Sequence, residues 1–533
     1  MEINHDGLLY LLNEKDFTAE VSSSLEALGH NIVIPNSISY HSQEFYITKL
    51  GCNSFASNHS INLLSLYDDS KLKMICQDAF HNSSISTLKI PASVEDLNEG
   101  WCNSTMKLNH ISISEKNKRY KVIDNKVIIG KSDLNDDNYD NLIFACRDII
   151  NCTVPSYIKH ITSYSFKECQ RLNSIIFPDN SELLSIGKES FYMSSIAQIS
   201  IPDQVTKISK STFALCRNLK KVTFSKSYKL EKIEEGAFLF TSIEEITIPS
   251  HVKIIESRAF SRCRKLQSFQ FSEGSEIRQF ESATFYDSSL QNLYIPSNVY
   301  LLKEGWCASL MKLTNIFLSP ENENFTYLNE KVILGKTDLT TNNFDVLVRA
   351  CSDIEEVVVP SYIKQIDSCA FHMCQKLKKI EFDKNSQLVS IGSKTFADSS
   401  IDKIVVPCSV EIIGAGAFFG CSKLKRVEFE ENSKLDLIDQ MALAYCPVDG
   451  IVVPAQVKNV QDDAFICCGN LKSIEFLGNP DVKLGKMIDT LKNIELISFP
   501  NSTEIFVGEF KKASKTDFRL FTCAGTKIKK ENK

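Results

Sequence analysis

Aromatic residues recur along this chain at intervals that alternate mainly between 25 and 22 residues. Most of the series repeats once after a shift of 205 residues, so that Phe80 maps onto Phe285 and Trp101 onto Trp306 without a gap. The copy of Phe238 falls on Leu443, and we expect that turn to be the loosest of the second block. Fixed spacing predicts a tandem solenoid whose function lies on an extended face. The series comprises Phe55, Phe80, Trp101, Phe166, Phe191, Phe213, Phe238, Phe260, Phe285, Trp306, Phe371, Phe396, Phe418 and Phe465.

The composition suits one long folded array. The chain has 533 residues, a formal net charge of -6 and 43% hydrophobic residues, which indicates an ordered core and no nucleic-acid partner. Its start lacks the basic stretch and apolar run of a signal peptide, and no apolar stretch is long enough to span a bilayer.

The cysteines follow the repeat. Cys169, Cys216 and Cys263 are 47 residues apart, as are Cys374, Cys421 and Cys468. If 47 residues make two turns, these α-carbons lie roughly 10 Å apart, which is beyond the reach of a disulfide. We therefore expect buried free thiols in a reducing compartment and no metal site, because no zinc-type spacing is present.

Each turn contains a short strand of the form LxxIxI. Its fourth and sixth positions share one face and point inward, while the third and fifth face solvent. A proline often follows the strand, as at Pro249 and Pro407, and ends its hydrogen bonding. The remainder of the turn is too short for a long helix, so we expect short extended or 3₁₀ segments there.

Segments at about 115–150 and 320–355 interrupt the repeat with two apolar runs around a polar stretch, which predicts inserted β-hairpins. A binding role for these loops stays open. Residues 1–46 resemble a degenerate repeat that caps the array, residues 47–506 form the solenoid, and residues 507–533 are a basic tail that we expect to be flexible.

The repeat pattern resembles a known family. The segment VVVPSYIKQIDSCAFHMCQKLKKIEF, residues 357–382, is similar to the BspA-like leucine-rich repeat, and the likeness covers roughly residues 30 to 500. The resemblance implies a mainly β solenoid, a curved leucine-rich-repeat array with one parallel sheet on its concave face. It also implies surface proteins of bacteria and protists that are associated with adhesion.

No catalytic arrangement emerges from the sequence. The run from Gly414 to Gly420 superficially resembles a nucleotide loop, but it occupies ordinary positions of the repeat and lacks the GxGxxG spacing. The nine histidines have no partner at ligand or triad spacing. We therefore expect no enzyme activity, no catalytic residue, no cofactor and no metal.

Outward strand positions supply the candidate partner-binding residues. Exposed aromatic residues on a rigid sheet are plausible anchors, although a hairpin that covers them would explain them equally well. The charged residues can pair across strands, so a self-neutralised solvent face is the alternative for them. The candidates are Tyr294, Phe317, Val358, Lys379, Glu381, Lys403, Val405, Arg426, Glu428 and Val452.

Two functions remain open. The first is a noncatalytic protein–protein interaction module in cell-surface binding or adhesion, and the alternative is an intracellular scaffold or regulatory binding protein. The resemblance implies a cell-surface or secreted location, whereas the reduced-type cysteines and the lack of a signal or anchor favour the cytoplasm. The sequence names neither the partner protein nor the oligomeric state.

Overall fold

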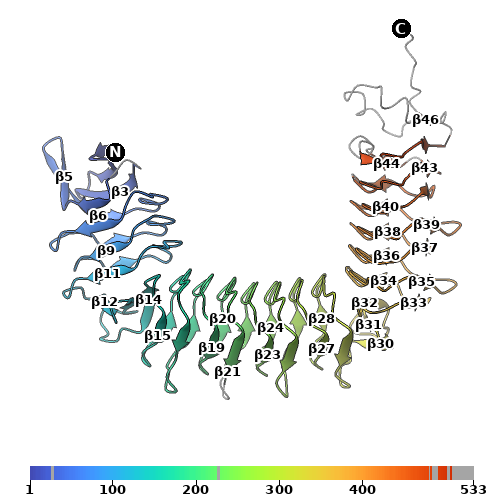
Figure 1. Ribbon diagram of the computed structural model, residues 1–533, viewed down its shortest axis with the longest axis horizontal. Coiled ribbons are helices and arrows are strands. Elements are labelled where there is room, and N and C mark those ends of the chain that lie inside the picture. The colour runs from blue at the N-terminus through green and yellow to red at the C-terminus, as the bar shows by residue number, and fades with distance from the viewer. Residues whose placement is uncertain are drawn as a thin grey trace, which may run out of the picture. The chain divides into compact units, whose positions relative to one another are not determined.

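The computed structural model describes residues 1–25, 29–224, 228–461, 463–478, 480–482, 490–500 and 505–506, and its bounded elements are all β-strands (Figure 1). The basic tail predicted for residues 507–533 lies outside these described residues. The chain forms two compact units, Met1–Leu266 with Gln270–Ile277 and Gln267–Phe269 with Arg278–Lys533. Each unit is a stack of parallel turns, as the repeat predicts.

Each turn contributes one long strand, and the long strands pair in parallel within several separate sheets. In β19, Ile199 and Ile201 are buried while Gln198 and Ser200 are exposed, because side chains alternate across a strand. The long strands of the first unit are β4 (Asn31–Ile34), β7 (Leu63–Leu66), β9 (Thr87–Ile90), β11 (His110–Ile113), β15 (Asn151–Thr153), β17 (Ser174–Ile176), β19 (Gln198–Ile201), β21 (Lys221–Phe224) and β23 (Glu245–Ile248). β25 (Ser268–Phe271) contains the boundary between the units.

Two-residue strands form a second parallel ladder, so the segments expected opposite the long strands are extended. Figure 1 shows β19 and β23 on one side of the stack and β20 and β24 on the other. The short strands of the first unit are β8 (Met74–Ile75), β10 (Asp96–Leu97), β16 (His160–Ile161), β18 (Ser185–Ile186), β20 (Lys207–Ile208), β22 (Lys232–Ile233) and β24 (Ile254–Ile255). β8 also pairs in parallel with the C-terminal end of β6 (Gln43–Leu50). The N-terminal part of β6 pairs antiparallel with β5 (Ser37–Tyr40).

The second unit repeats both ladders. Its long strands are β27 (Asn292–Ile295), β29 (Asn315–Leu318), β33 (Glu356–Val359), β35 (Lys379–Phe382), β37 (Lys403–Val406), β39 (Arg426–Phe429), β41 (Gly450–Val453), β43 (Ser473–Phe476) and β45 (Leu496–Ser498), with β46 (Ile505–Phe506) antiparallel to β45. Its short strands are β26 (Gln279–Phe280), β28 (Leu301–Leu302), β34 (Gln365–Ile366), β36 (Ser390–Ile391), β38 (Ile412–Ile413), β40 (Leu437–Ile438), β42 (Asn459–Val460) and β44 (Asp481–Val482).

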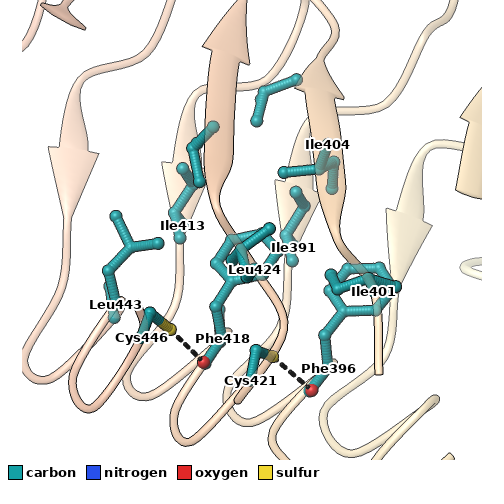
Figure 2. Close-up of a cluster of buried hydrophobic side chains, with 14 of the residues drawn as sticks. Ile391, Phe396, Ile401, Ile404, Ile413, Phe418, Cys421, Leu424, Leu443 and Cys446 are labelled. Atoms are coloured by element: carbon teal, nitrogen blue, oxygen red, sulfur yellow. Dashed lines mark hydrogen bonds between the residues drawn. The ribbon is translucent and has the colours of Figure 1, made fainter. Parts of the chain in front are cut away.

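The aromatic series forms a buried column between the ladders. In the second unit Phe396 is fully buried and stacks on Phe371 and Phe418, with ring centroids 5.2 and 5.3 Å apart and interplanar angles of 9°. The next position is the buried Leu443, so the stack stops there (Figure 2). The column explains the constant spacing, because each turn must return one ring to the same place.

Left-handed residues on both sides of each ring make the tight loop that holds it. Around Phe418 these are Gly416, with φ of 59°, and Gly420, with φ of 67°. Around Phe371 they are Cys369 and Met373, each with φ of 62°. The glycine-rich run at 414–420 is therefore a tight turn that serves packing, since glycine adopts positive φ without steric cost.

Cysteines three positions after Phe418 and Leu443 tie neighbouring turns together. The thiol of Cys421 donates a hydrogen bond to the carbonyl oxygen of Phe396 at 3.0 Å, and that of Cys446 donates to Phe418 at 3.0 Å (Figure 2). The described cysteines are all free, as their spacing predicts. Burial raises the pKa of Cys216 to about 12 and that of Cys263 to about 11, so these thiols stay protonated. Their role is structural.

One three-stranded antiparallel unit precedes the first long strand, and two more lie between long strands. The latter two are the insertions that the sequence predicts as hairpins, each with one strand more than a hairpin, whereas the sequence did not reveal the unit at residues 2–24. The last strand of each joins the short-strand ladder in parallel, as β14 does with β16. The three units are β1 (Glu2–His5), β2 (Leu8–Asn13) and β3 (Thr18–Ser24), then β12 (Tyr120–Ile123), β13 (Val127–Gly130) and β14 (Asn141–Ala145), then β30 (Thr326–Asn329), β31 (Val332–Gly335) and β32 (Val346–Ala350).

Side chains of the second insertion, β30–β32, cap the open edge of β29. The Lys331 ammonium donates to the carbonyl oxygen of Thr314 at 2.9 Å and pairs with Asp353 at 3.0 Å. The Tyr327 hydroxyl accepts a hydrogen bond from the amide of Leu318 at 2.7 Å and donates to the carbonyl of Ile316 at 3.0 Å. Exposed strand edges invite unwanted pairing, so this insertion protects the sheet where the ladder is broken.

Candidate binding surface

The structure places all the predicted partner-binding residues on the outward face of the long strands of the second unit. They form two groups, because the insertion β30–β32 separates β29 from β33 in the chain. Tyr294 and Phe317 lie directly opposite each other on β27 and β29. The other eight residues lie on β33–β41.

Tyr294 and Phe317, the aromatic pair, are open to solvent. Their exposed fractions are 41% and 51%, so the insertion does not cover them. Asn292 and Asn315 flank them on the same face and share a side-chain hydrogen bond of 2.8 Å. This end of the face therefore presents two rings and two amides without a formal charge.

Valine and glutamate alternate at the third position of six successive long strands. Val358 lies opposite Glu381 on the neighbouring strand, and the same pairing recurs 47 residues later as Val405 with Glu428. A third copy pairs Val452 with Glu475. These six residues are named the Val/Glu row. The valines are 51%, 37% and 46% exposed in chain order, which is far more than a core residue would be.

Cations occupy the first position of three of these strands, β35, β37 and β39, whereas β33 begins with Glu356. Lys379, Lys403 and Arg426 form this cation row. The Lys379 ammonium lies 2.8 Å from Glu381, and this hydrogen bond raises the pKa of the lysine. The Lys403 ammonium lies 2.8 Å from Glu428 on the adjacent strand. Both pairs are about half exposed, so solvent screening keeps their contribution to the stability of the fold small.

Arg426 completes the cation row in a different setting. It lies opposite Lys403 and Gly450 on its two neighbouring strands. Its guanidinium has no salt bridge among the described residues, and an exposed guanidinium keeps five donors available for a partner. The face is thus only partly self-neutralised.

A hollow of about 800 Å³ adjoins the end of the Val/Glu row. Its lining includes Arg426, Glu428 and Val452, and the loop 430–434 forms one side of it. Leu477, which is 49% exposed, also lines it, although our sequence reasoning overlooked this residue. The 47-residue repeat could have identified it, because Leu477 is equivalent to Glu430 one repeat earlier and so occupies a position where a charged residue otherwise stands.

Other chemistry is sparse on the described part of the chain. No group of three or more histidine, cysteine, aspartate or glutamate side chains there could hold a metal ion. Nor does any helix within it have the length and apolarity needed to cross a membrane. What the surface offers is an extended face with apolar, cationic and anionic side chains in fixed register, which suits the binding of a macromolecule.

Stacked parallel turns with a repeating apolar core define the protein as a leucine-rich-repeat solenoid. A family model described as the BspA type leucine rich repeat region matches residues 30–135, 138–263, 231–350, 345–472 and 389–517. The chain therefore belongs to the BspA-type leucine-rich repeat family. No match was found among the curated proteins.

Several solved structures are similar to this chain. A leucine-rich repeat protein from Eubacterium ventriosum is 18% identical, with 72% of this chain and 96% of that chain covered and a TM-score of 0.47. The pneumococcal vaccine antigen PcpA is 17% identical, with coverages of 94% and 99% and a TM-score of 0.44. A leucine-rich cell surface protein from Faecalibacterium prausnitzii is 18% identical, with coverages of 94% and 95% and a TM-score of 0.36.

Proposed function

We propose that this protein is a noncatalytic protein-binding module whose binding surface is the outward face of the second unit. The observation that carries the proposal is the Val/Glu row. Three valines recur 47 residues apart at equivalent solvent-facing positions, and each is more than a third exposed. Solvent-facing strand positions ordinarily hold polar residues, so an ordered row of exposed valines indicates a surface that a partner covers.

The charged neighbours support a protein partner. Salt bridges at 2.8 Å join Lys379 and Lys403 to glutamates of the same face, so part of the charge pattern is already arranged before a partner binds. Ordered side chains lose less entropy when a partner arrives. The face combines exposed valines with charged neighbours, and protein–protein interfaces likewise combine apolar contacts with a polar rim.

A capture experiment with the full chain tests the proposal. Cell or host extracts are passed over the wild type, over a triple variant with Val358, Val405 and Val452 each changed to Lys, and over a Val33→Lys control. Val33 also faces outward from a long strand, β4, and is 53% exposed, but it belongs to the first unit. We expect one partner that wild type and control retain and the triple variant loses. Equal retention by all three proteins would refute the proposal.

Two cellular locations are candidates for this binding. Family membership favours binding at a cell surface or adhesion. The free, mostly buried thiols of the described chain favour a scaffold in a reducing compartment. Protease treatment of intact cells distinguishes them, because a surface protein is digested before lysis and an intracellular scaffold only afterwards.

A further inference from the structure

Two cysteines meet where the first antiparallel unit joins the short-strand ladder. Cys52 lies two residues after the end of β6, and Cys76 directly follows β8. These strands pair in parallel, with Leu50 opposite Ile75, and the amide of Cys76 donates to the carbonyl oxygen of Leu50 at 2.9 Å. The thiols of Cys52 and Cys76 are within hydrogen-bonding distance of each other, although the residues are 24 positions apart in the sequence. The fold therefore brings two thiols together from adjacent turns.

The two thiols differ in their access to solvent. Cys52 is exposed, and it is the one exposed cysteine among the residues that the structure describes. Cys76 is buried, with 3% of its surface exposed. A column cysteine such as Cys421 follows its ring by three residues, whereas Cys52 and Cys76 precede the rings of their turns. Neither therefore occupies the position at which a thiol ties neighbouring turns together.

A charged pair lies beside the thiols. The Lys49 ammonium interacts with both sulfurs and lies 2.9 Å from the Glu20 carboxylate on β3. Gly51 permits this packing, because a β-carbon there would collide with the Glu20 carboxylate. A nearby ammonium favours the thiolate, which is the reactive form of cysteine. Burial raises the pKa of Cys76 to about 11, and Lys49 opposes this shift. Cys52 is thus placed to meet an oxidant from solvent, and Cys76 is placed to react with the product.

We propose that Cys52 and Cys76 form a reversible dithiol–disulfide site whose oxidant is a small disulfide of the glutathione type. The Cys52 thiolate attacks one sulfur of the small disulfide, which gives a mixed disulfide and releases one small thiolate. Cys76 then attacks the Cys52 sulfur and expels the second small thiolate, so the protein disulfide forms. The two protein thiols lose two electrons, their two protons pass to the released thiolates, and the small disulfide is reduced to two thiols.

The new bond joins two turns whose rings, Phe55 and Phe80, stack on each other. It belongs to the first unit, whereas the proposed binding face belongs to the second, so it adds a separate site to the protein.

Peptide mapping of the full chain tests the proposal. The folded protein is incubated with glutathione disulfide, its free thiols are blocked, and it is digested with trypsin without reduction. Cys52 and Cys76 fall in separate tryptic peptides, residues 50–71 and 74–89, each with a single cysteine. We expect mass spectrometry to find these two peptides joined, and dithiothreitol to separate them again. Cys76→Ser should abolish the joined pair and leave glutathione attached to Cys52.

A buried pair of thiols provides the control. Figure 2 shows Cys421 and Cys446 on adjacent turns, and their thiols are also within hydrogen-bonding distance, but both are fully buried. We expect glutathione disulfide to leave this pair unjoined in the folded chain. Joining of both pairs alike would refute the selection of Cys52 by its exposure. Wild-type protein that keeps glutathione on Cys52 without joining Cys76, or that shows no reaction at Cys52, would refute the dithiol site.

Discussion

Replacing Phe396 with leucine measures how much the aromatic column contributes to the fold. The ring is fully buried and stacks on one ring at 5.2 Å and on another at 5.3 Å. Leucine keeps most of the apolar volume but removes both stacked contacts. Each aromatic pair contributes about 0.5–1.5 kcal/mol beyond its buried area, so we expect Phe396→Leu to lower the free energy of unfolding by about 1–3 kcal/mol.

The same exchange at an exposed site provides the control. Phe317 is 51% exposed and lies outside the column, so Phe317→Leu should change the free energy by less than about 0.5 kcal/mol. Urea denaturation gives both values. Hydrogen exchange should also show faster opening of β36 and β38, because neighbouring turns in a solenoid support one another. Equal effects of the two substitutions would refute the column as a source of stability.

Three further predictions concern two buried side chains and one half-buried lysine. Cys421→Ala should lower the free energy of unfolding by about 1–2 kcal/mol. Cys421→Ser should lower it by less, because serine keeps a donor for the Phe396 carbonyl. Urea denaturation of the two variants measures both changes. Burial, with Arg349 and Lys394 nearby, lowers the pKa of His372 to about 4, so the unfolded chain binds this proton first as the pH falls. This histidine should therefore contribute a loss of stability of about 3 kcal/mol between pH values of about 6.5 and 4, opposed by the Asp367 carboxyl, whose pKa burial raises to about 6. His372→Leu should remove the histidine's part of the pH dependence of the urea midpoint. Lys331→Met should lower the free energy of unfolding by about 1–3 kcal/mol, because it leaves the Thr314 carbonyl and the Asp353 carboxylate without their donor. Protease cleavage of loop 336–345 should then become faster.

Sequence periodicity was enough to predict the solenoid and the inward face of its long strands. Spacing alone carried that information, since each turn must return Phe396 and its equivalents to one column. The short-strand ladder was harder to predict from the sequence, because two-residue strands such as β38 are too short to show a pattern of alternating side chains. The first antiparallel unit was missed because residues 2–24 have no close copy elsewhere in the chain.

The candidate site was predictable in part. Alternation along each strand identified Val405 and Glu428 as outward neighbours, and the structure places them opposite each other. The same rule could not show that Lys403 pairs with Glu428 while Arg426 stays outside any described salt bridge, because rotamers decide that. The hollow was also invisible, since it depends on the path of loop 430–434.

Site-specific photocrosslinking tests the central claim most directly. A photoreactive residue replaces Val405 on the Val/Glu row in one protein and Val33 in another, and each is irradiated with the partner that wild type captures. The account predicts a covalent adduct from position 405 and none from position 33. An adduct from position 33, or none from position 405 while the partner remains bound, would contradict it.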